Sequence, residues 1–432
     1  MSKYLFTVPD GGGTTPPQLS VAAALVARGH DVRVLCDPVL EPEVGLIGAR
    51  HVPWTRGPHR YVRSIETEPV SAWEAKTPLG AFARFRDEVM FGPAAAYAED
   101  VLEELSREAA DVVASDLVLV GAQIAAEVAA VPNAVLITTI YPLPAPGLPP
   151  LGPGWKPANG AVGRCRDTAM SALQRRMWNG GLGALNSARA VHGLAPLEEA
   201  LDQPIRADRT LVLTSSSFDF PARELPPGVR YVGPRLDDPG WVSGWTPPPG
   251  EDPLVLVGFT TAYQAHEDAL RRTAAALSGL PVRAVLTTGP TVDPAEIEAG
   301  PNVQVLRSAP HREILERAQL AITHGGHGTT IKALAAGVPV LCMPMGADQA
   351  DVAARLVASG AGVRIRPRSR PAAIARAAAR MLAEPGFSEA AQRMAAAIAA
   401  DLRQDLAALE LESLLRIGSP AEGRPGLMNA AR

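Results

Sequence analysis

The chain alternates short apolar segments with longer segments in which apolar residues recur at helical spacing. The first apolar run covers residues 4–8, and the second covers residues 32–36. Between them, a loop with the sequence DGGGTTPP precedes the segment QLSVAAALVARG, which has prolines just before it and ends on Gly29. Proline before and glycine after a periodic segment predict the limits of a helix. The order strand, loop, helix, strand is typical of parallel strands joined by crossover helices.

The same alternation continues along the rest of the chain. In the first half it predicts helices over 101–110 and 120–130 and strands over 111–116, 134–139 and 210–214. In the second half it predicts strands over 253–260, 282–288, 303–308, 320–324 and 339–344 and helices over 266–279, 311–318 and 328–336. Residues 142–157 contain seven prolines and predict a long surface loop, of the kind that often borders a binding site.

One segment between the two halves is predicted to be a linker. Residues 233–253 are rich in Pro, Gly and Trp and show neither a helical nor a strand period. We therefore predict a first domain over 1–232, a linker over 233–253, a second domain over 254–388, and a C-terminal helix over about 389–415 that packs back onto the first domain. Ligands bind at the carboxyl ends of such parallel sheets, so we expect a site in the cleft between two facing Rossmann-like domains.

Composition narrows the class of protein. Of the 432 residues, 47% are apolar and 20% are charged, which is ordinary for a soluble globular protein. The net charge of −4 argues against a nucleic-acid partner. The three cysteines are far apart and match no disulfide or metal pattern, so a reducing, cytoplasmic setting is expected. The N-terminus lacks the pattern of a signal peptide, and Asp116, Glu127 and Pro132 interrupt the most apolar stretch, so we expect no membrane span.

The segment 321–349, AITHGGHGTTIKALAAGVPVLCMPMGADQ, carries the clearest chemistry. A strand ends before His324, two glycines follow, and a helix begins near His327. Glycines let a backbone approach a phosphate closely, and a helix N-terminus presents free N–H groups. His324 and the hydroxyl of Thr329 add donors, so the segment suits a diphosphate leaving group. The alternative is that the glycines only form a tight turn.

Several features of this segment resemble the donor-binding signature of glycosyltransferase family 1, the UDP-glycosyltransferase-like enzymes with the GT-B fold. They are His-Gly-Gly-x-Gly-Thr from His324, then Gly337-Val338-Pro339, Pro344 and Asp348-Gln349. Ala309-Pro310-His311 and the ARGHDV segment at 27–32 resemble the family as well. The resemblance covers almost the whole chain and is closest to bacterial enzymes that decorate natural products.

The resemblance implies a donor site on the second domain. In the family, His324 and Thr329 would hold the diphosphate with the backbone near Gly326, His327 and Gly328. Asp348 and Gln349 would hold sugar hydroxyls, although the same two residues are also expected to start the next helix. The remaining donor-binding candidates, in the loop after the first strand of this domain and in the turn against the base, are Thr260, Thr261, Ser308, Ala309 and His311.

Lys332 departs from the family pattern. Many relatives carry a glutamate there that binds both ribose hydroxyls, and a lysine cannot accept a hydrogen bond. This departure favours a dTDP-sugar over a UDP-sugar. The alternative is that Lys332 is a solvated helix residue with no contact to the donor.

Thr14 is a second departure, because the family has a histidine there that removes a proton from the acceptor. Threonine is no base near neutral pH, so we name two carboxylates as candidate catalytic groups beside Thr14. Asp116 ends a predicted strand, and Asp10 follows the first strand. Burial would raise the pKa of such a carboxyl and make it a better base. The alternatives are a helix cap for Asp116 and a turn residue for Asp10.

Aromatic and methionine side chains of the first domain predict an adaptable apolar pocket for the acceptor. Most such residues are core residues, and only a minority is expected to line the site. The acceptor-binding candidates are Gly13, Trp73, Phe85, Met90, Tyr141 and Met177.

The sequence therefore predicts an inverting glycosyltransferase that moves a sugar, we expect a deoxysugar, from a dTDP-linked donor to a lipophilic polyketide or macrolide aglycone. The resemblance implies no metal and no cofactor beyond the nucleotide-sugar co-substrate. Two alternatives stay open: an idle homologue that binds a ligand or activates a partner enzyme, and a nicotinamide oxidoreductase suggested by the glycines after Asp10. The O-, N- or C-linkage and a homodimeric state also stay open.

Overall fold

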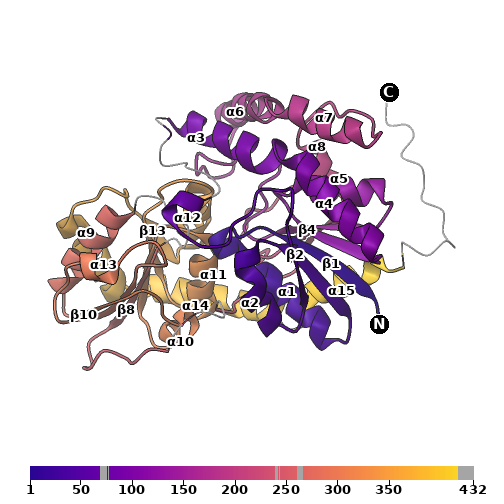
Figure 1. Cartoon of the computed structure of the whole chain (residues 1–432). Helices are drawn as coiled ribbons and strands as arrows, with labels where there is room; N and C mark the ends of the chain where they lie inside the picture. The colour runs from indigo at the N-terminus through magenta and orange to yellow at the C-terminus, as the bar shows by residue number, and fades with distance from the viewer. Residues whose placement is uncertain (69–74, 76, 239–241, 243, 260–265, 417–432) are drawn as a thin grey trace.

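The chain forms two α/β domains, each built on one parallel sheet (Figure 1). The computed structural model describes all residues except 69–74, 76, 239–241, 243, 260–265 and 417–432. The first sheet has the order β3-β2-β1-β4-β5-β6-β7 and the second has the order β10-β9-β8-β11-β12-β13. The predicted class, two Rossmann-like domains of the GT-B type, is confirmed.

The bounds of the elements follow the predicted alternation. The first sheet consists of β1 (Lys3–Val8), β2 (Asp31–Cys36), β3 (Arg50–Pro53), β4 (Val112–Asp116), β5 (Asn133–Ile137), β6 (Arg209–Val212) and β7 (Val229–Tyr231). Its helices are α1 (Thr15–Ala27), α2 (Glu41–Leu46), α3 (Pro78–Arg84), α4 (Ala94–Arg107), α5 (Val120–Val128), α6 (Ala161–Asn179), α7 (Leu182–Val191) and α8 (Asp202–Ile205).

The second domain repeats the plan. Its strands are β8 (Leu254–Gly258), β9 (Arg283–Thr287), β10 (Val303–Leu306), β11 (Leu320–Thr323), β12 (Val340–Cys342) and β13 (Gly362–Arg364). Its helices are α9 (Glu267–Ser278), α10 (His311–Leu315), α11 (His327–Ala335), α12 (Gln349–Ser359) and α13 (Pro371–Ala383). The described chain ends with two more helices, α14 (Pro385–Asp401) and α15 (Leu406–Leu414).

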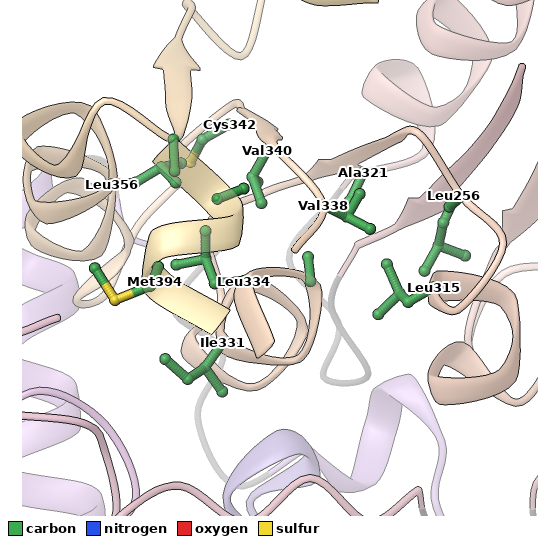
Figure 2. Close-up of a cluster of buried hydrophobic side chains, with 14 of the residues drawn as sticks. Leu256, Leu315, Ala321, Ile331, Leu334, Val338, Val340, Cys342, Leu356 and Met394 are labelled. Carbon is green, nitrogen blue, oxygen red and sulfur yellow. The ribbon is translucent and has the colours of Figure 1, made fainter. Parts of the chain in front are cut away.

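The central strands are buried on both faces, which explains why most of their residues are apolar. Every residue of β4, β5 and β8 is buried. In the second domain, Leu256, Val340 and Leu356 belong to one cluster with side chains of α11 (Figure 2). Met394 of α14 packs into the same cluster. Helices on each face of the sheet therefore exclude water from its apolar strands.

The helix predicted over 389–415 is divided in two. Met394 and Ile398 of α14 pack in the second domain, whereas Leu411 and Leu414 of α15 pack against the first domain. In Figure 1 these helices, in yellow, pass from the second domain to the first. The Asp405 side chain accepts a hydrogen bond from the Ala408 amide and so starts α15 as a separate helix.

Each sheet reverses its strand order at one place, and loops from both reversal points carry candidate residues. In the first sheet, Thr7 of β1 lies opposite Leu35 of β2 on one side and Ser115 of β4 on the other. In the second sheet, β8 lies between β9 and β11 in the same way. Such points form crevices at the carboxyl ends of the strands, where ligands bind.

One face of α12 bonds to the first domain. Asp348 caps the helix and accepts a hydrogen bond from the Thr139 hydroxyl. Asp351, three residues later, accepts hydrogen bonds from the amides of Gly152 and Gly154 in the proline-rich loop. Because residues three and four apart share a helix face, this spacing directs all the bonds toward the first domain.

The third residue on this face, Arg355, forms a buried ion pair. Arg355 Nε lies 2.6 Å from Asp219 Oδ1, and both side chains are almost fully buried. Asp219 also accepts hydrogen bonds from the Tyr141 amide and the Tyr231 hydroxyl, so its charge is fully compensated. The network therefore ties α12 to the end of the first sheet.

We predict that Asp219→Ala lowers the free energy of unfolding by about 3–5 kcal/mol, because it leaves the Arg355 guanidinium buried without its partner. Urea denaturation followed by fluorescence measures this change. Glu384→Ala is the matched control, because it removes an ion pair with Arg380 whose side chains are mostly exposed. Equal unfolding midpoints for the two variants would contradict the prediction.

Candidate functional site

The loop after β11 forms the centre of the candidate site. His324 follows the strand and is buried, Gly325 has a φ of 92°, and Gly326 caps α11. A Cβ on Gly326 would lie 2.5 Å from His324 Nε2, so only glycine fits beside the imidazole ring. The first amides of α11 therefore stand next to His324, which is the arrangement that suits a phosphate.

Burial determines the charge of His324. Burial, with a smaller contribution from the neighbouring His266, lowers the pKa of this imidazole to about 3. Thr323 Oγ1 lies 3.2 Å from His324 Nδ1 and leaves Nε2 on the side of Gly326. In the neutral form, one ring nitrogen can donate a hydrogen bond without carrying a charge.

Other donor-site candidates surround this loop. His311 starts α10, its ring lies against Gly258 at the end of β8, and its Nε2 lies 2.9 Å from Thr287 Oγ1. Ala309 is buried, Ser308 precedes it, and Thr329 is half-buried in the first turn of α11. Thr260 and Thr261 lie outside the residues that the structure describes.

His327 faces the first domain. Its Nε2 lies 2.7 Å from Thr214 Oγ1, and its ring lies 6.2 Å from that of Phe218. Burial lowers its pKa to about 4. The sequence placed His327 with the donor residues, whereas the structure uses its side chain to join the two domains.

Asp348 and Gln349 lie at the start of α12, as the sequence predicted for its helix-starting alternative. Asp348 is half-buried, and burial raises the pKa of its carboxyl. Its contact with the Thr139 hydroxyl shows that it accepts a hydrogen bond from an alcohol in this position. The Gln349 side-chain oxygen accepts hydrogen bonds from the amides of Met345 and Gly346 and so supports the loop before α12.

Lys332 contacts the linker. Its Nζ lies 2.6 Å from Asp238 Oδ1 and 2.7 Å from the Asp237 carbonyl oxygen. Asp238 also accepts a hydrogen bond from the Arg312 amide, and the Asp237 carboxylate accepts one from the Ser20 hydroxyl of α1. The lysine therefore links α11 to the segment that joins the domains.

The loop after β1 lies opposite the donor loop. Gly13 and Thr14 are in a short 3-10 turn before α1, and a Cβ on Gly328 would lie 4.0 Å from the Gly13 carbonyl oxygen. Two loops that are more than 300 residues apart in the chain thus meet across the cleft. The structure brings the predicted acceptor side and the predicted donor side together here.

The two candidate carboxylates lie in different surroundings. Asp10 is bound by Arg60 and Arg63, whose Nε atoms lie 2.8 and 2.9 Å from its Oδ2. Asp116, at the end of β4, contacts no cation among the described residues: within them its carboxylate accepts hydrogen bonds only from the Val118 amide and from Gln18 Nε2. Burial raises the pKa of Asp116 to about 6. The geometry therefore favours Asp116 as the candidate base, whereas Asp10 forms ion pairs with Arg60 and Arg63.

The acceptor candidates differ in burial: some are core residues and others are half-buried. Met90 packs in the core with Trp54 and Phe91, and Tyr141 is buried among the side chains around β5 and β6. Phe85 and Met177 are half-buried where α6 meets a π-helical turn (Phe85–Phe91), and Arg86 binds the Met177 carbonyl oxygen. Trp73 lies outside the described residues.

Two of the aromatic side chains from which the sequence predicts an acceptor pocket lie at the same junction. The Phe82 and Trp178 rings are 4.6 Å apart and nearly perpendicular, which joins α3 to α6. Both side chains are half-buried. Figure 1 shows α3 and α6 together along one side of the first domain.

The structure contains no sign of a resident metal or of a membrane helix in the part that it describes. Among the described residues, no three His, Cys, Asp or Glu side chains converge as metal ligands would. Within the same residues, no helix is both long and apolar enough to cross a bilayer.

Comparisons with known proteins agree with this geometry. Residues 275–413 match the family model "Erythromycin biosynthesis protein CIII-like, C-terminal domain". The chain is 32% identical over 406 residues to 4'-demethylrebeccamycin synthase of Lentzea aerocolonigenes. The aligned region covers 91% of this chain and 94% of that protein. It is 27% identical to the oleandomycin glycosyltransferase of Streptomyces antibioticus over 78% of this chain and 73% of the relative.

Solved structures share the fold over nearly the full length. The calicheamicin glycosyltransferase CalG4 superposes with a TM-score of 0.76 at 24% identity and covers 96% of this chain and 98% of its own. The glycosyltransferase VinC, whose structure is a complex with dTDP, superposes with a TM-score of 0.67 at 19% identity, covering 96% and 99%.

We predict that Gly326→Ala weakens the binding of thymidine diphosphate about tenfold or more, because the new Cβ displaces the His324 ring and one phosphate donor is lost. Calorimetric titration measures the affinity. Gly346→Ala is the control, since a Cβ there meets no atom of the described residues within 4 Å. Equal affinities for both variants and the wild type would show that His324 does not contact the diphosphate.

Proposed function

The chain belongs to the glycosyltransferases of natural-product biosynthesis, and from that premise we propose that it is an inverting enzyme that transfers a deoxysugar from a dTDP-linked donor to a lipophilic aglycone. The observation that carries the proposal is the meeting of two loops. The first turn of α11 with His324 lies on one side of the cleft, and Gly13, Thr14 and Asp116 belong to the other.

Family membership decides between the alternatives. An oxidoreductase is excluded, because the relatives are glycosyltransferases. The glycines after Asp10 instead form the turn that faces Gly328. None of the relatives supports an idle homologue, and the donor loop keeps His324 beside the start of α11.

The donor side of the proposal rests on charge. The diphosphate leaving group gains negative charge as its bond to the anomeric carbon breaks and the acceptor oxygen bonds to that carbon. The helix N-terminus with the His324 N–H stabilises that charge. Asp348 supplies a hydrogen-bond acceptor for a sugar hydroxyl, as it does now for Thr139.

The choice of a dTDP donor rests on Lys332. Its ammonium is bound to Asp238 and to the Asp237 carbonyl oxygen, and it has no lone pair to accept a ribose hydroxyl. A donor whose pentose lacks the 2′-hydroxyl loses no hydrogen bond when residue 332 is a lysine. The dTDP complex of VinC, a protein with the same fold, supports this choice.

The acceptor side of the proposal rests on Asp116. A hydroxyl of the acceptor attacks the anomeric carbon from the face opposite the diphosphate, and its proton passes to the Asp116 carboxylate directly or through water. The carboxylate is a stronger base than usual because burial raises its pKa to about 6. The half-buried rings of Phe82, Phe85 and Trp178 suit the apolar body of an aglycone.

We expect the wild type to bind thymidine diphosphate more tightly than uridine diphosphate and His324→Ala to lose most of its affinity for both. Lys332→Glu restores an acceptor and should shift the preference toward uridine diphosphate by about tenfold. Lys332→Met breaks the same ion pair with Asp238 without adding an acceptor and controls for that loss. Titration calorimetry with both nucleotides tests this, and a wild-type preference for uridine diphosphate would overturn the donor assignment.

We predict that Asp116→Asn lowers the rate of transfer 10²–10⁴-fold, because the proton acceptor is lost. In the wild type, the rate should rise with pH through about 6, since the carboxylate must be ionised to act as a base. Asp10→Asn should lower stability and leave this rise in place, because Asp10 pairs with Arg60 and Arg63. A wild-type rate in Asp116→Asn would remove Asp116 from the mechanism.

A further inference from the structure

Gln18 connects the proposed base to the loop where the family histidine is missing. It lies in the first half of α1, and its side chain is completely buried. Its Nε2 lies 2.5 Å from Asp116 Oδ2 and 3.1 Å from the carbonyl oxygen of Thr14. A single amide group therefore bonds both to the carboxylate and to the backbone of the first loop.

The second contact determines which way the amide of Gln18 points. The Thr14 carbonyl oxygen can only accept a hydrogen bond, so the nitrogen of the amide must face it. The amide oxygen of Gln18 is buried and has no hydrogen-bond partner among the described residues. Turning the amide over would set this oxygen against two acceptors, the Thr14 carbonyl and the Asp116 carboxylate. Gln18 thus offers Asp116 a donor and never an acceptor.

Both oxygens of Asp116 consequently face N–H groups. Oδ2 accepts from Gln18, and Oδ1 accepts from the Val118 amide at 2.9 Å. A proton added to either oxygen would compete with one of these donors, whereas the ionised carboxylate accepts both. The two hydrogen bonds lower the pKa of Asp116, and burial raises it.

We propose that Gln18 is a positioning residue for sugar transfer: it holds the Asp116 carboxylate ionised and fixed relative to the first loop, in the place of the missing histidine. This role rests on the proposed function, in which Asp116 receives the proton of the acceptor. Gln18 does not itself touch the reacting atoms, because its side chain is fully covered.

Few other charges face Asp116 from the elements packed around it. Helix α1 and strand β5 carry no charged side chain, and β1 carries only Lys3 at its opposite end. On α5, Glu127 is paired with Arg189. Asp10 after β1 is paired with two arginines, and across the cleft Asp348 bonds to Thr139. Gln18 is thus the side chain through which the ionisation of Asp116 can be changed.

The test replaces Gln18 by methionine, which has a similar shape and no donor. Gln123→Met is the matched control, because Gln123 is equally buried on α5 but donates to the backbone oxygens of Asp116 and Leu117 rather than to the carboxylate. The first readout is the infrared titration of the Asp116 carboxyl, taken as the difference from Asp116→Asn. The second is the pH profile of transfer of a deoxysugar from dTDP-rhamnose to quercetin.

We expect Gln18→Met to move both the infrared midpoint and the acidic limb of the rate profile upward by about one to two pH units. Gln123→Met should leave both in place. An unmoved midpoint in Gln18→Met, or an equal movement in Gln123→Met, would overturn the role of Gln18. If Gln18→Met does not fold, Gln18→Leu takes its place in the same comparison.

A different result separates this inference from the proposed function. If the infrared midpoint moves while the limb of the rate profile stays, Gln18 controls the ionisation of Asp116 but Asp116 is not the base. That result overturns the proposed mechanism and, with it, a role for Gln18 in transfer. Loss of transfer in Asp116→Asn together with parallel movement of both readouts supports the two assignments.

Discussion

The bonds along one face of α12 are the constraint on which the rest of the site depends. Two parallel sheets reverse their strand order at β1 and at β8, and each reversal opens a crevice at one end of its own sheet. Asp348, Asp351 and Arg355 bond to the first domain and so hold the two crevices toward each other. The Gly13 carbonyl then lies opposite Gly328, and a donor on one domain can meet an acceptor on the other.

Two buried aspartates of the first domain lie in different surroundings, which suit them to different roles. Asp10 is held by two guanidinium groups, so its charge is neutralised and it fixes the segment that carries Arg60 and Arg63. Asp116 is held by two neutral N–H donors, so its charge is oriented but not neutralised. A carboxylate of the second kind keeps its basicity, and burial increases it.

Local features were predictable from the sequence, and distant contacts were not. The apolar runs predicted the strands, and the glycines between His324 and α11 predicted the donor loop. Both predictions succeed because strands and tight turns depend on residues that are neighbours in the sequence. Nothing near Asp10 reveals Arg60, and nothing near His327 reveals Thr214, which lies in the other domain. Gln18 could have been noticed as the one amide side chain of the mostly apolar helix α1, but its partner is 98 residues away. The break before α15 likewise follows from each helix packing on a different domain.

The proposed role of Asp116 as acceptor of the proton of the attacking group is tested by varying the acidity of that group. A thiophenol is already ionised at neutral pH and needs no base, whereas an alcohol or phenol of similar shape does. If Asp116 is the base, Asp116→Asn transfers the deoxysugar from dTDP-rhamnose to the thiophenol at a rate close to that of the wild type, while its rate with the oxygen acceptor collapses. An equal loss with both acceptors would contradict the claim, because it would show that Asp116 supports the fold of the cleft rather than the transfer of a proton.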